Sequence, residues 1–496
     1  MKSKILILIA VITTIITSCA SPVPVAPSPA QVSSPTPKVV PTDLPTPVTI
    51  KFWEWYGGAW GDFCEEEAAL FNKQYPWITV EVSHYPDQNA YREVLTLAFE
   101  SNTAPDTYIR RHTFQQIFDN NWALPLDQWA TPEWLSRFPK GSFVETKNGW
   151  DGHIYTFPYY ANKFERVLYI NEDMFREAGL VEQSGEIMVP QTWSELRSAA
   201  KQITETGQGN YYGIGVGIKD PRHMSWWFDL ANLAGASGTY EIDYRTAKYS
   251  FGVDPVFTEI AELLVGMKND GSVYPNESAL DDSNLYSFFG QEKYAMFLSG
   301  SWSASNLKRD FPDFQNYRII PLPIPDEGRN GGLPYAPGSG SFYMSSQTKY
   351  PNESWLWLNW LSSREHHIRM VTKGLDYSIY QDLNTPQNVT DTHKWQAYEA
   401  VTKYLVLLPF PPARNPQTGL VRPAAVVPDL GDVLVGIYTG QITDWKQALQ
   451  DLDERKQSSF QEAITQAQAN GANVSIDDFI FPDWNPMEDY ITQPSK

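Results

Sequence analysis

The sequence is short of cysteine, of charge and of long apolar runs. Two of its 496 residues are cysteines, Cys19 and Cys64, and charged residues make up 19% of the chain, below the usual quarter. No stretch of 18 or more apolar residues occurs, so we expect no permanent membrane-spanning helix. The hydrophobic content of 42% excludes a disordered chain, and the composition excludes a coiled coil.

Basic residues are also scarce. The chain has 38 lysines and arginines against 58 acidic residues, a net charge of −20, which becomes −22 if Lys2 and Lys4 are removed with a leader. So acidic a surface repels phosphate backbones, which argues against nucleic acid as a partner. No basic stripe indicates binding to anionic lipid.

Motifs of catalysis and metal binding are missing as well. No G-x-S-x-G elbow occurs, and Gly338-Ser339-Gly340-Ser341 lacks that pattern. The seven histidines show no metal-ligand spacing. His366 and His367 are neighbours in a helical segment, and we expect a solvated pair pointing to different faces. The sequence therefore predicts no catalytic residue, no metal site and no cofactor.

The N-terminus has the pattern of a targeting segment. Lys2 and Lys4 precede a short apolar run, Ile5 to Ile16, and Ile16-Thr17-Ser18-Cys19 resembles the lipobox of bacterial lipoproteins. That resemblance implies that residues 1–18 are a signal peptide and that Cys19 is lipidated. The alternative is an ordinary signal peptide with a chance cysteine. Cys64 would then be a lone thiol packed as a small hydrophobe.

A tether follows in residues 19–47. Nine of residues 21–47 are prolines, with serine and threonine between them. Such a segment cannot bury apolar surface and favours an extended state that spans roughly 80 Å at about 3.1 Å per residue. We interpret it as a spacer between the membrane and the folded part.

The folded part begins with alternating strand and helix patterns. Strands are predicted at 48–55, 78–82 and 104–109, with helices at 62–75 and 91–100 between them. This β-α-β-α-β order predicts a mostly parallel sheet, and ligands of such sheets bind beyond the carboxyl ends of the strands. The side chains expected there are Trp53, Trp55 and Tyr56 after the first strand, and Arg110 and Arg111 after the third.

Several segments in a fixed order carry a resemblance. They are Phe71 to Val80 (FNKQYPWITV), Ala104-Pro105-Asp106, Leu124 to Asp127 (LPLD), Val167 to Leu180 (VLYINEDMFREAGL), Pro190 to Leu196 (PQTWSEL), and Phe289 to Phe297 with Gly300-Ser301-Trp302. Together they resemble the extracellular solute-binding proteins of ATP-binding-cassette importers, in the group that serves sugars. The resemblance covers nearly all of 48–496, although the proline-rich stretch from Pro409 to Pro428 matches no pattern of the family.

The resemblance implies an α/β, two-lobed fold of the periplasmic-binding-protein type. Each lobe would be a mostly parallel sheet flanked by helices, with the ligand cleft between the lobes. The first lobe would hold 48–158 plus 318–378, and the second 159–317 plus 379–496. The chain would cross near Pro158-Tyr159, near Arg318 to Leu322 and near Tyr377, and the lobes would close on the ligand like a hinge.

Aromatic residues are abundant, at 14% of the chain with 18 tryptophans. Sugar sites use aromatic faces for C–H surfaces and carboxylate or arginine groups for hydroxyls. Each tryptophan could equally be core packing, and of the adjacent Trp226 and Trp227 at most one should face the core. The predicted ligand-binding residues are Trp53, Trp55, Tyr56, Trp60, Arg110, Arg111, Trp226, Trp227, Asp229 and Trp302.

Two functions remain open from the sequence. The first is a lipid-anchored, monomeric receptor on the outer face of the cytoplasmic membrane that captures a sugar and passes it to permease subunits. The second is a lipid-anchored secreted glycosidase with the same aromatic cleft; with 58 acidic residues, its catalytic pair of acids cannot be picked out. The ordered motifs and the missing catalytic constellation favour the first.

Overall fold

The fold is described by a computed structural model for residues 46–85, 88–139, 142–143, 147–161, 165–236, 242–335 and 340–492. The predicted signal peptide, Cys19 and nearly all of the tether lie outside the described residues. Residues 47–496 form one unit by their backbone contacts. In the described ranges, no helix is both long and apolar enough to cross a membrane.

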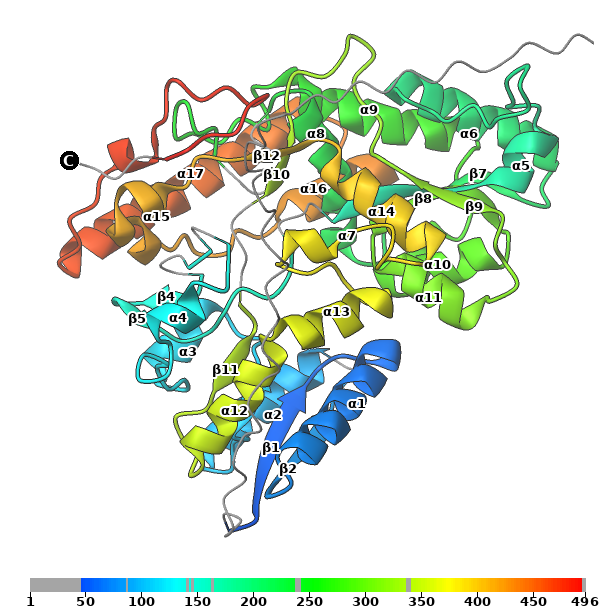
Figure 1. The fold of residues 1–496 in the computed structure, drawn as a ribbon. Helices are drawn as coiled ribbons and strands as arrows, with labels where there is room; N and C mark the ends of the chain where they lie inside the picture. The colour runs from blue at the N-terminus through cyan, green and yellow to red at the C-terminus, as the bar shows by residue number, and fades with distance from the viewer. Residues whose placement is uncertain are drawn as a thin grey trace, which may run out of the picture. The chain divides into compact units, whose positions relative to one another are not determined.

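The first sheet follows the predicted β-α-β-α-β pattern. β1 (Val48–Glu54) pairs in parallel with β2 (Ile78–His84) and with β3 (Thr107–Ile109), and α1 (Gly58–Gln74) and α2 (Gln88–Glu100) make the crossovers. β11 (Phe342–Met344) adds an antiparallel edge, so the strand order is β11-β3-β1-β2. The mostly parallel sheet predicted for this lobe is confirmed, and α1 and α12 (Pro351–Leu361) pack beside it (Figure 1).

The second sheet is not mostly parallel, contrary to the prediction. Its order is β7-β8-β6-β9, and β6 (Arg166–Asn171) runs antiparallel to both β8 (Tyr294–Gly300) and β9 (Tyr317–Ile320). β7 (Tyr212–Gly215) pairs with β8 in parallel. The local strand–helix alternation could not predict this direction, because β6 pairs with strands that lie more than 120 residues further along the chain.

Helices surround the second sheet and continue to the C-terminal part of the chain. The helical segment from Pro221 to Leu233 is divided, since its middle turn is a 3-10 helix. The elements are α5 Glu172–Glu177, α6 Trp193–Gly207, α7 Pro221–Ser225, η1 Trp226–Asp229, α8 Leu230–Leu233, α9 Pro255–Asn269, η2 Glu277–Ala279, α10 Asp282–Gly290, α11 Ser303–Asp310, α14 Thr392–Thr402, α16 Leu430–Thr439, α17 Trp445–Ala469 and η5 Ile476–Phe479.

Short elements complete the chain around the first sheet and between the lobes. They are α3 Phe114–Asp119, α4 Pro132–Leu135, β4 Gly149–Trp150, β5 His153–Ile154, β10 Leu333–Tyr335, α13 Arg364–Thr372, η3 Gln381–Leu383, β12 Leu405–Leu407, α15 Pro411–Arg414 and η4 Pro416–Leu420.

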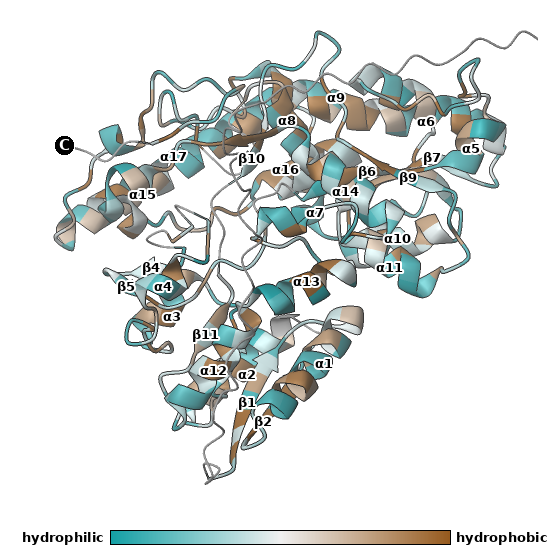
Figure 2. Ribbon diagram, in the orientation of Figure 1, coloured by the Kyte–Doolittle hydropathy of each residue, from teal (hydrophilic) through white to brown (hydrophobic). Residues whose placement is uncertain are grey.

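Separate apolar cores hold the two sheets. Ile50, Phe52 and Trp357 belong to the first core, whereas Leu168 and Met296 belong to the second, and all five side chains are fully buried. Figure 2 shows hydrophobic residues along β6, in the interior, while α1 alternates between hydrophilic and hydrophobic faces. Cys64 is buried in the first core, as predicted for a lone packed thiol, and burial raises the pKa of its thiol.

The second and third chain crossings come later than predicted. β9 pairs with β6, so residues 318–320 lie in the second sheet, and the chain returns to the first sheet only at β11. Residues after 378 still pack in the first core, as Ile379 and Val389 do. The first crossing lies beside the third, because Tyr160 forms an isolated bridge with Ser378. Among the described residues, the second sheet therefore extends to residue 320 and the first core to Val389.

Candidate ligand-binding site

An aromatic cluster lies where β1 ends and the chain first crosses between the sheets. Trp55 follows β1, and its ring centre is 4.8 Å from that of Tyr56. Tyr56 stacks on Trp60, in the first turn of α1, at 4.7 Å and an interplanar angle of 24°. The hydroxyls of Tyr56 and Tyr160 share a hydrogen bond, and Tyr160 belongs to the crossing segment. Three of the predicted residues thus lie together at the edge of the first lobe.

Arg110 and Arg111 lie at the carboxyl end of β3, as predicted, but their guanidinium groups are used differently. Arg110 donates to the backbone oxygens of Gly340 (3.4 Å) and His112 (3.2 Å), which fixes loops of its own lobe. The guanidinium of Arg111 lies over the Trp55 ring, 5.1 Å from its centre. The Trp55 ring is itself held, because its Nε1 donates to the Arg110 carbonyl at 3.3 Å.

The second lobe presents arginine on an aromatic support. The Arg166 guanidinium lies 4.4 Å from the ring centre of Trp226, and that of Arg222 lies 6.0 Å away. Arg166 Nε is also 3.6 Å from Oδ2 of Asp229, which is 5% exposed. Trp226 is 4% exposed, so in this conformation its role is to hold arginines rather than to offer a free face.

Trp302 is half-buried immediately after β8 and before α11. Its ring meets Trp226 edge-on at 5.9 Å. A Cβ added at Gly300 would lie 2.1 Å from the Trp302 ring, so only glycine allows the ring to approach the strand this closely. The strand before Trp302 is buried along its whole length, and its last residue, Gly300, shapes the approach of the ring.

The remaining two predicted tryptophans, Trp227 and Trp53, are less well placed to contact a ligand. Trp227 is 1% exposed inside the second core, so no face of its ring is left for a ligand in this conformation, and the adjacent Trp226 is buried too. The expectation that only one of the pair would be buried is wrong, because the 3-10 turn of η1 directs both rings inward. Trp53 is half-buried beside Tyr85, with ring centres 5.1 Å apart.

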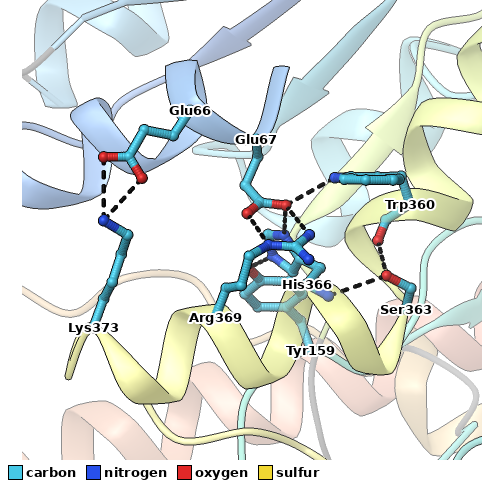
Figure 3. A network of polar contacts seen from close by, with 8 residues as sticks. All are labelled: Glu66, Glu67, Tyr159, Trp360, Ser363, His366, Arg369 and Lys373. Atoms are coloured by element: carbon cyan, nitrogen blue, oxygen red, sulfur yellow. Dashed lines mark hydrogen bonds and ion pairs between the residues drawn. The ribbon is translucent and has the colours of Figure 1, made fainter. Parts of the chain in front are cut away.

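His366 and His367 are both buried, contrary to the expected solvated pair. Figure 3 shows the reason for His366: its Nδ1 donates to Glu67 at 2.9 Å, and its Nε2 accepts from the hydroxyl of Tyr159 at 2.5 Å. His367 Nδ1 pairs with the Ser378 hydroxyl at 3.0 Å. Tyr159 of the first crossing and Ser378 of the third are therefore both held by hydrogen bonds to histidines of α13.

Glu67 is the centre of that network. It accepts two hydrogen bonds from Arg369, each of 2.6 Å, and one of 2.8 Å from Trp360 Nε1. Burial alone would raise the pKa of Glu67, but its hydrogen bonds to Arg369 and His366 outweigh burial and lower it to about 2. The network joins α1 to α12 and α13 beneath the first crossing.

A cavity of about 560 Å³ is built by the proline-rich segment that the sequence could not assign. Its wall includes Lys147 of the first lobe, Pro334 and Tyr335 of β10, and residues of the C-terminal segments. Aromatic rings face it from several parts of the chain, including Tyr244, Tyr335 and Phe410. Its size lies in the range of small-molecule sites.

The site also contains residues that sequence analysis missed. Arg166 and Tyr160 lie at the first crossing, and Arg222 lies on α7 beside Asp220, with 3.5 Å between Nη2 and Oδ2. Tyr160 directly follows the predicted crossing at Pro158-Tyr159, so its position in the sequence could have indicated a place in the site. No sequence pattern could have indicated the two arginines, because their role depends on where Trp226 lies in the fold. In the described part of the chain, no group of histidine, cysteine and acidic residues could hold a metal ion.

Comparison with known proteins gives one family and one fold. Residues 57–367 match the sequence model of bacterial extracellular solute-binding proteins. The sn-glycerol-3-phosphate-binding periplasmic protein UgpB of Escherichia coli K12 is 23% identical over 373 residues, which are 72% of this chain and 74% of UgpB.

Solved structures resemble the whole two-lobed architecture. The GacH receptor of Streptomyces glaucescens, solved without ligand and with acarbose, matches with a TM-score of 0.65 and 18% identity over 84% of this chain and 98% of GacH. The sugar-binding protein MalE of Xanthomonas citri matches with a TM-score of 0.60 and 21% identity over 86% of this chain and all of MalE. At these identities the likeness establishes the periplasmic-binding-protein fold.

Proposed function

Because the chain belongs to the family of bacterial extracellular solute-binding proteins, we propose that it captures a carbohydrate outside the cytoplasm and delivers it to an ATP-binding-cassette permease. One observation carries the choice of carbohydrate: aromatic side chains of both lobes gather at the lobe boundary. Trp55 and Trp60 come from the first lobe and Trp302 from the second. Flat amphipathic rings suit the C–H faces of sugars, with arginine and aspartate beside them for hydroxyl groups.

The relatives support the same class of ligand. GacH binds acarbose, MalE is a sugar-binding protein, and the similar RafE was solved in complex with raffinose. We therefore propose a binding protein without catalytic activity, acting as a monomer toward the permease.

A ligand screen tests the carbohydrate function. Mono- and oligosaccharides should raise the melting temperature, because a ligand at 100 times its dissociation constant stabilises the protein by about 2.7 kcal/mol. Chromatography of the ligand recovered after incubation should show it unchanged, whereas a cleaved product would indicate a glycosidase. Amino acids and peptides form the control panel, and stabilisation by them instead of by sugars would contradict the proposal.

We also propose that Cys19 is lipidated and that residues 19–47 hold the binding unit away from the membrane. The support is the lipobox-like sequence Ile16–Cys19 and the proline-rich composition that follows it. Two or more acyl chains anchor a protein stably, whereas one does not.

Replacement of Cys19 by serine tests the anchor. Cys19→Ser should move the protein from the membrane fraction to the soluble fraction, or leave the leader uncleaved, and it should abolish labelling by a fatty acid. Cys64→Ser is the matched control, because that thiol is buried in the first core. Equal fractionation of wild type and Cys19→Ser, without labelling of either, would refute the anchor.

A further inference from the structure

Arg111 is a half-buried cation without an acidic partner among the described residues. Its guanidinium lies on the Trp55 ring at 5.1 Å, and no described carboxylate forms an ion pair with it. The two arginines beside Trp226 in the second lobe differ, since Arg166 lies 3.6 Å from Asp229 and Arg222 lies 3.5 Å from Asp220. In a chain with 20 more acidic than basic residues, an unpaired arginine at the lobe boundary is a local exception.

The charges around Arg111 are of the same sign. Burial lowers the pKa of its guanidinium, and the positive charges of Arg222, Arg92 and Arg110 lower it further. Arg222 belongs to α7 of the second lobe, whereas Arg92 and Arg110 belong to the first. Positive charge therefore converges on one place from both sides of the boundary between the lobes.

Two costs follow from this arrangement in the absence of a ligand. A guanidinium that is taken out of water without a counter-charge loses hydration free energy. Like charges that face each other across a boundary also oppose the approach of the two surfaces. A single anion between Arg111 and Arg222 would offset both costs, because it would neutralise the first charge and attract the second.

From this geometry we infer that the ligand is an acidic carbohydrate whose oxyanion, a carboxylate or a phosphate, binds to Arg111 while Arg222 approaches it from the second lobe. The inference rests on the proposed carbohydrate function and adds the charge of the ligand to it. Arg111 is positioned for this role, because its guanidinium is held over the Trp55 ring and a guanidinium can bind an oxyanion through two parallel N–H groups. The ring of Trp302 would then meet the uncharged part of the sugar.

Calorimetry with matched pairs of sugars tests the inference. Each pair holds a neutral sugar and its acidic counterpart: galactose and galacturonate, galactotriose and trigalacturonate, glucose and glucose 6-phosphate. We expect the acidic member of at least one pair to bind about tenfold to a hundredfold more tightly. Comparison of the uronates with glucose 6-phosphate shows whether the site prefers a carboxylate or a phosphate. The advantage should shrink as salt rises from about 0.05 M to 0.5 M, because salt screens partly exposed charges.

Variants of Arg111 connect the preference to this side chain. Arg111→Gln should remove most of the preference for the acidic sugar, and Arg111→Lys should restore part of it, because lysine keeps the charge but not the bidentate edge. Arg364→Gln is the matched control: it removes the same charge from the first lobe at the exposed pair with Asp382. Thermal melts of the unliganded variants show whether each is folded, and the salt series on the wild type tests the inference without a variant.

The outcomes separate the inference from the function on which it rests. Neutral sugars that bind as tightly as their acidic partners, with an affinity unaffected by Arg111→Gln, would overturn the acidic ligand and leave the carbohydrate function standing. Binding of no sugar in either form would overturn the carbohydrate function itself. A preference for acidic sugars that Arg111→Gln leaves intact would place the anion elsewhere and overturn the assignment to Arg111.

Discussion

At the scale of single residues, Glu67 is a buried carboxylate that holds several polar partners beneath the first crossing. Its carboxylate is 1% exposed and accepts charge-assisted hydrogen bonds from Arg369 and a hydrogen bond from Trp360. We expect Glu67→Gln to lower the free energy of unfolding by about 2–3 kcal/mol at neutral pH, because Arg369 loses its counter-charge. Urea denaturation at pH 7 measures the loss.

The neighbouring residue supplies the control for that change. Glu66→Gln breaks a pair with Lys373 in which both side chains are about half exposed, so it should cost less than about 1 kcal/mol. The pH dependence also distinguishes the two. The pKa of Glu67 is lowered to about 2, so its contribution is complete above its ordinary pKa near 4.5 and is lost as pH falls toward 2. A wild-type advantage over Glu67→Gln that persists unchanged at pH 2 would contradict this account.

Trp302 and Trp227 offer a second contrast between single residues. Trp302 is half-buried at the lobe boundary, and Trp302→Ala should weaken sugar binding by about tenfold to a hundredfold, with a modest loss of stability. Trp227 is enclosed in the second core, so Trp227→Ala should cost about 3–5 kcal/mol of stability instead. Calorimetric titration and thermal melts of both variants measure the contrast. Unaltered sugar affinity in Trp302→Ala would remove the stacking role.

The sequence pattern predicted part of the candidate ligand-binding site. Trp55, Tyr56, Trp60 and Arg111 lie together because the carboxyl ends of parallel strands share one edge of a sheet, which the β-α-β pattern already indicated. The sequence could not predict that both Trp226 and Trp227 are buried. That outcome depends on one 3-10 turn and on the arginine that covers Trp226.

At the scale of elements, local signals were most reliable at helix ends. Thr192 caps α6 in a capping box with Glu195, in which the Glu195 backbone donates to Thr192 Oγ1 and the Thr192 backbone donates to the Glu195 carboxylate. A threonine followed three residues later by a glutamate is the sequence signature of this box. The helix begins where its first unpaired backbone N–H groups find these hydrogen-bond partners. The start of the helix is therefore set by four consecutive residues and can be recognised in the local sequence.

The cap gives a prediction for the element. Thr192→Ala should lower the free energy of unfolding by about 1 kcal/mol, because one N–H of the first turn loses its partner. Sugar affinity should not change, since α6 lies apart from the candidate site. Ser198→Ala, at an exposed position of the same helix, is the control variant, and chemical denaturation compares the two. An equal effect of both changes would indicate that the cap hydrogen bond is not the cause.

Local sequence patterns could not predict whether the strands of a sheet run parallel or antiparallel. In the first lobe, consecutive strands pair through one helix each, so the parallel direction follows from the crossover rule. In the second lobe, β6 pairs with β8 and β9 across long intervening segments, and no rule of local sequence fixes that pairing. The burial of His366 was missed for the same reason, because Glu67 is 299 residues away in the chain.

At the scale of the whole molecule, the crossings carry the mechanical argument. Tyr159 and Ile379 share a backbone hydrogen bond of 3.2 Å, so the first and third crossings begin from one paired site in the first lobe. α13 holds this site through His366 and His367. We expect the rest of the crossing segments, not this anchored part, to absorb the change in backbone angles when the lobes close.

Closure on the ligand is the prediction that belongs to this scale. Small-angle scattering should show a smaller radius of gyration with the bound sugar than without it, because the ligand contacts both lobes and favours the state in which they approach. Arg222→Gln should make the unliganded protein more compact, since it removes one of the like charges that face Arg111 across the boundary. Arg245→Gln, whose side chain is paired with Asp243 in the second lobe, is the control. A radius that saturating ligand leaves unchanged would indicate a rigid, preformed site.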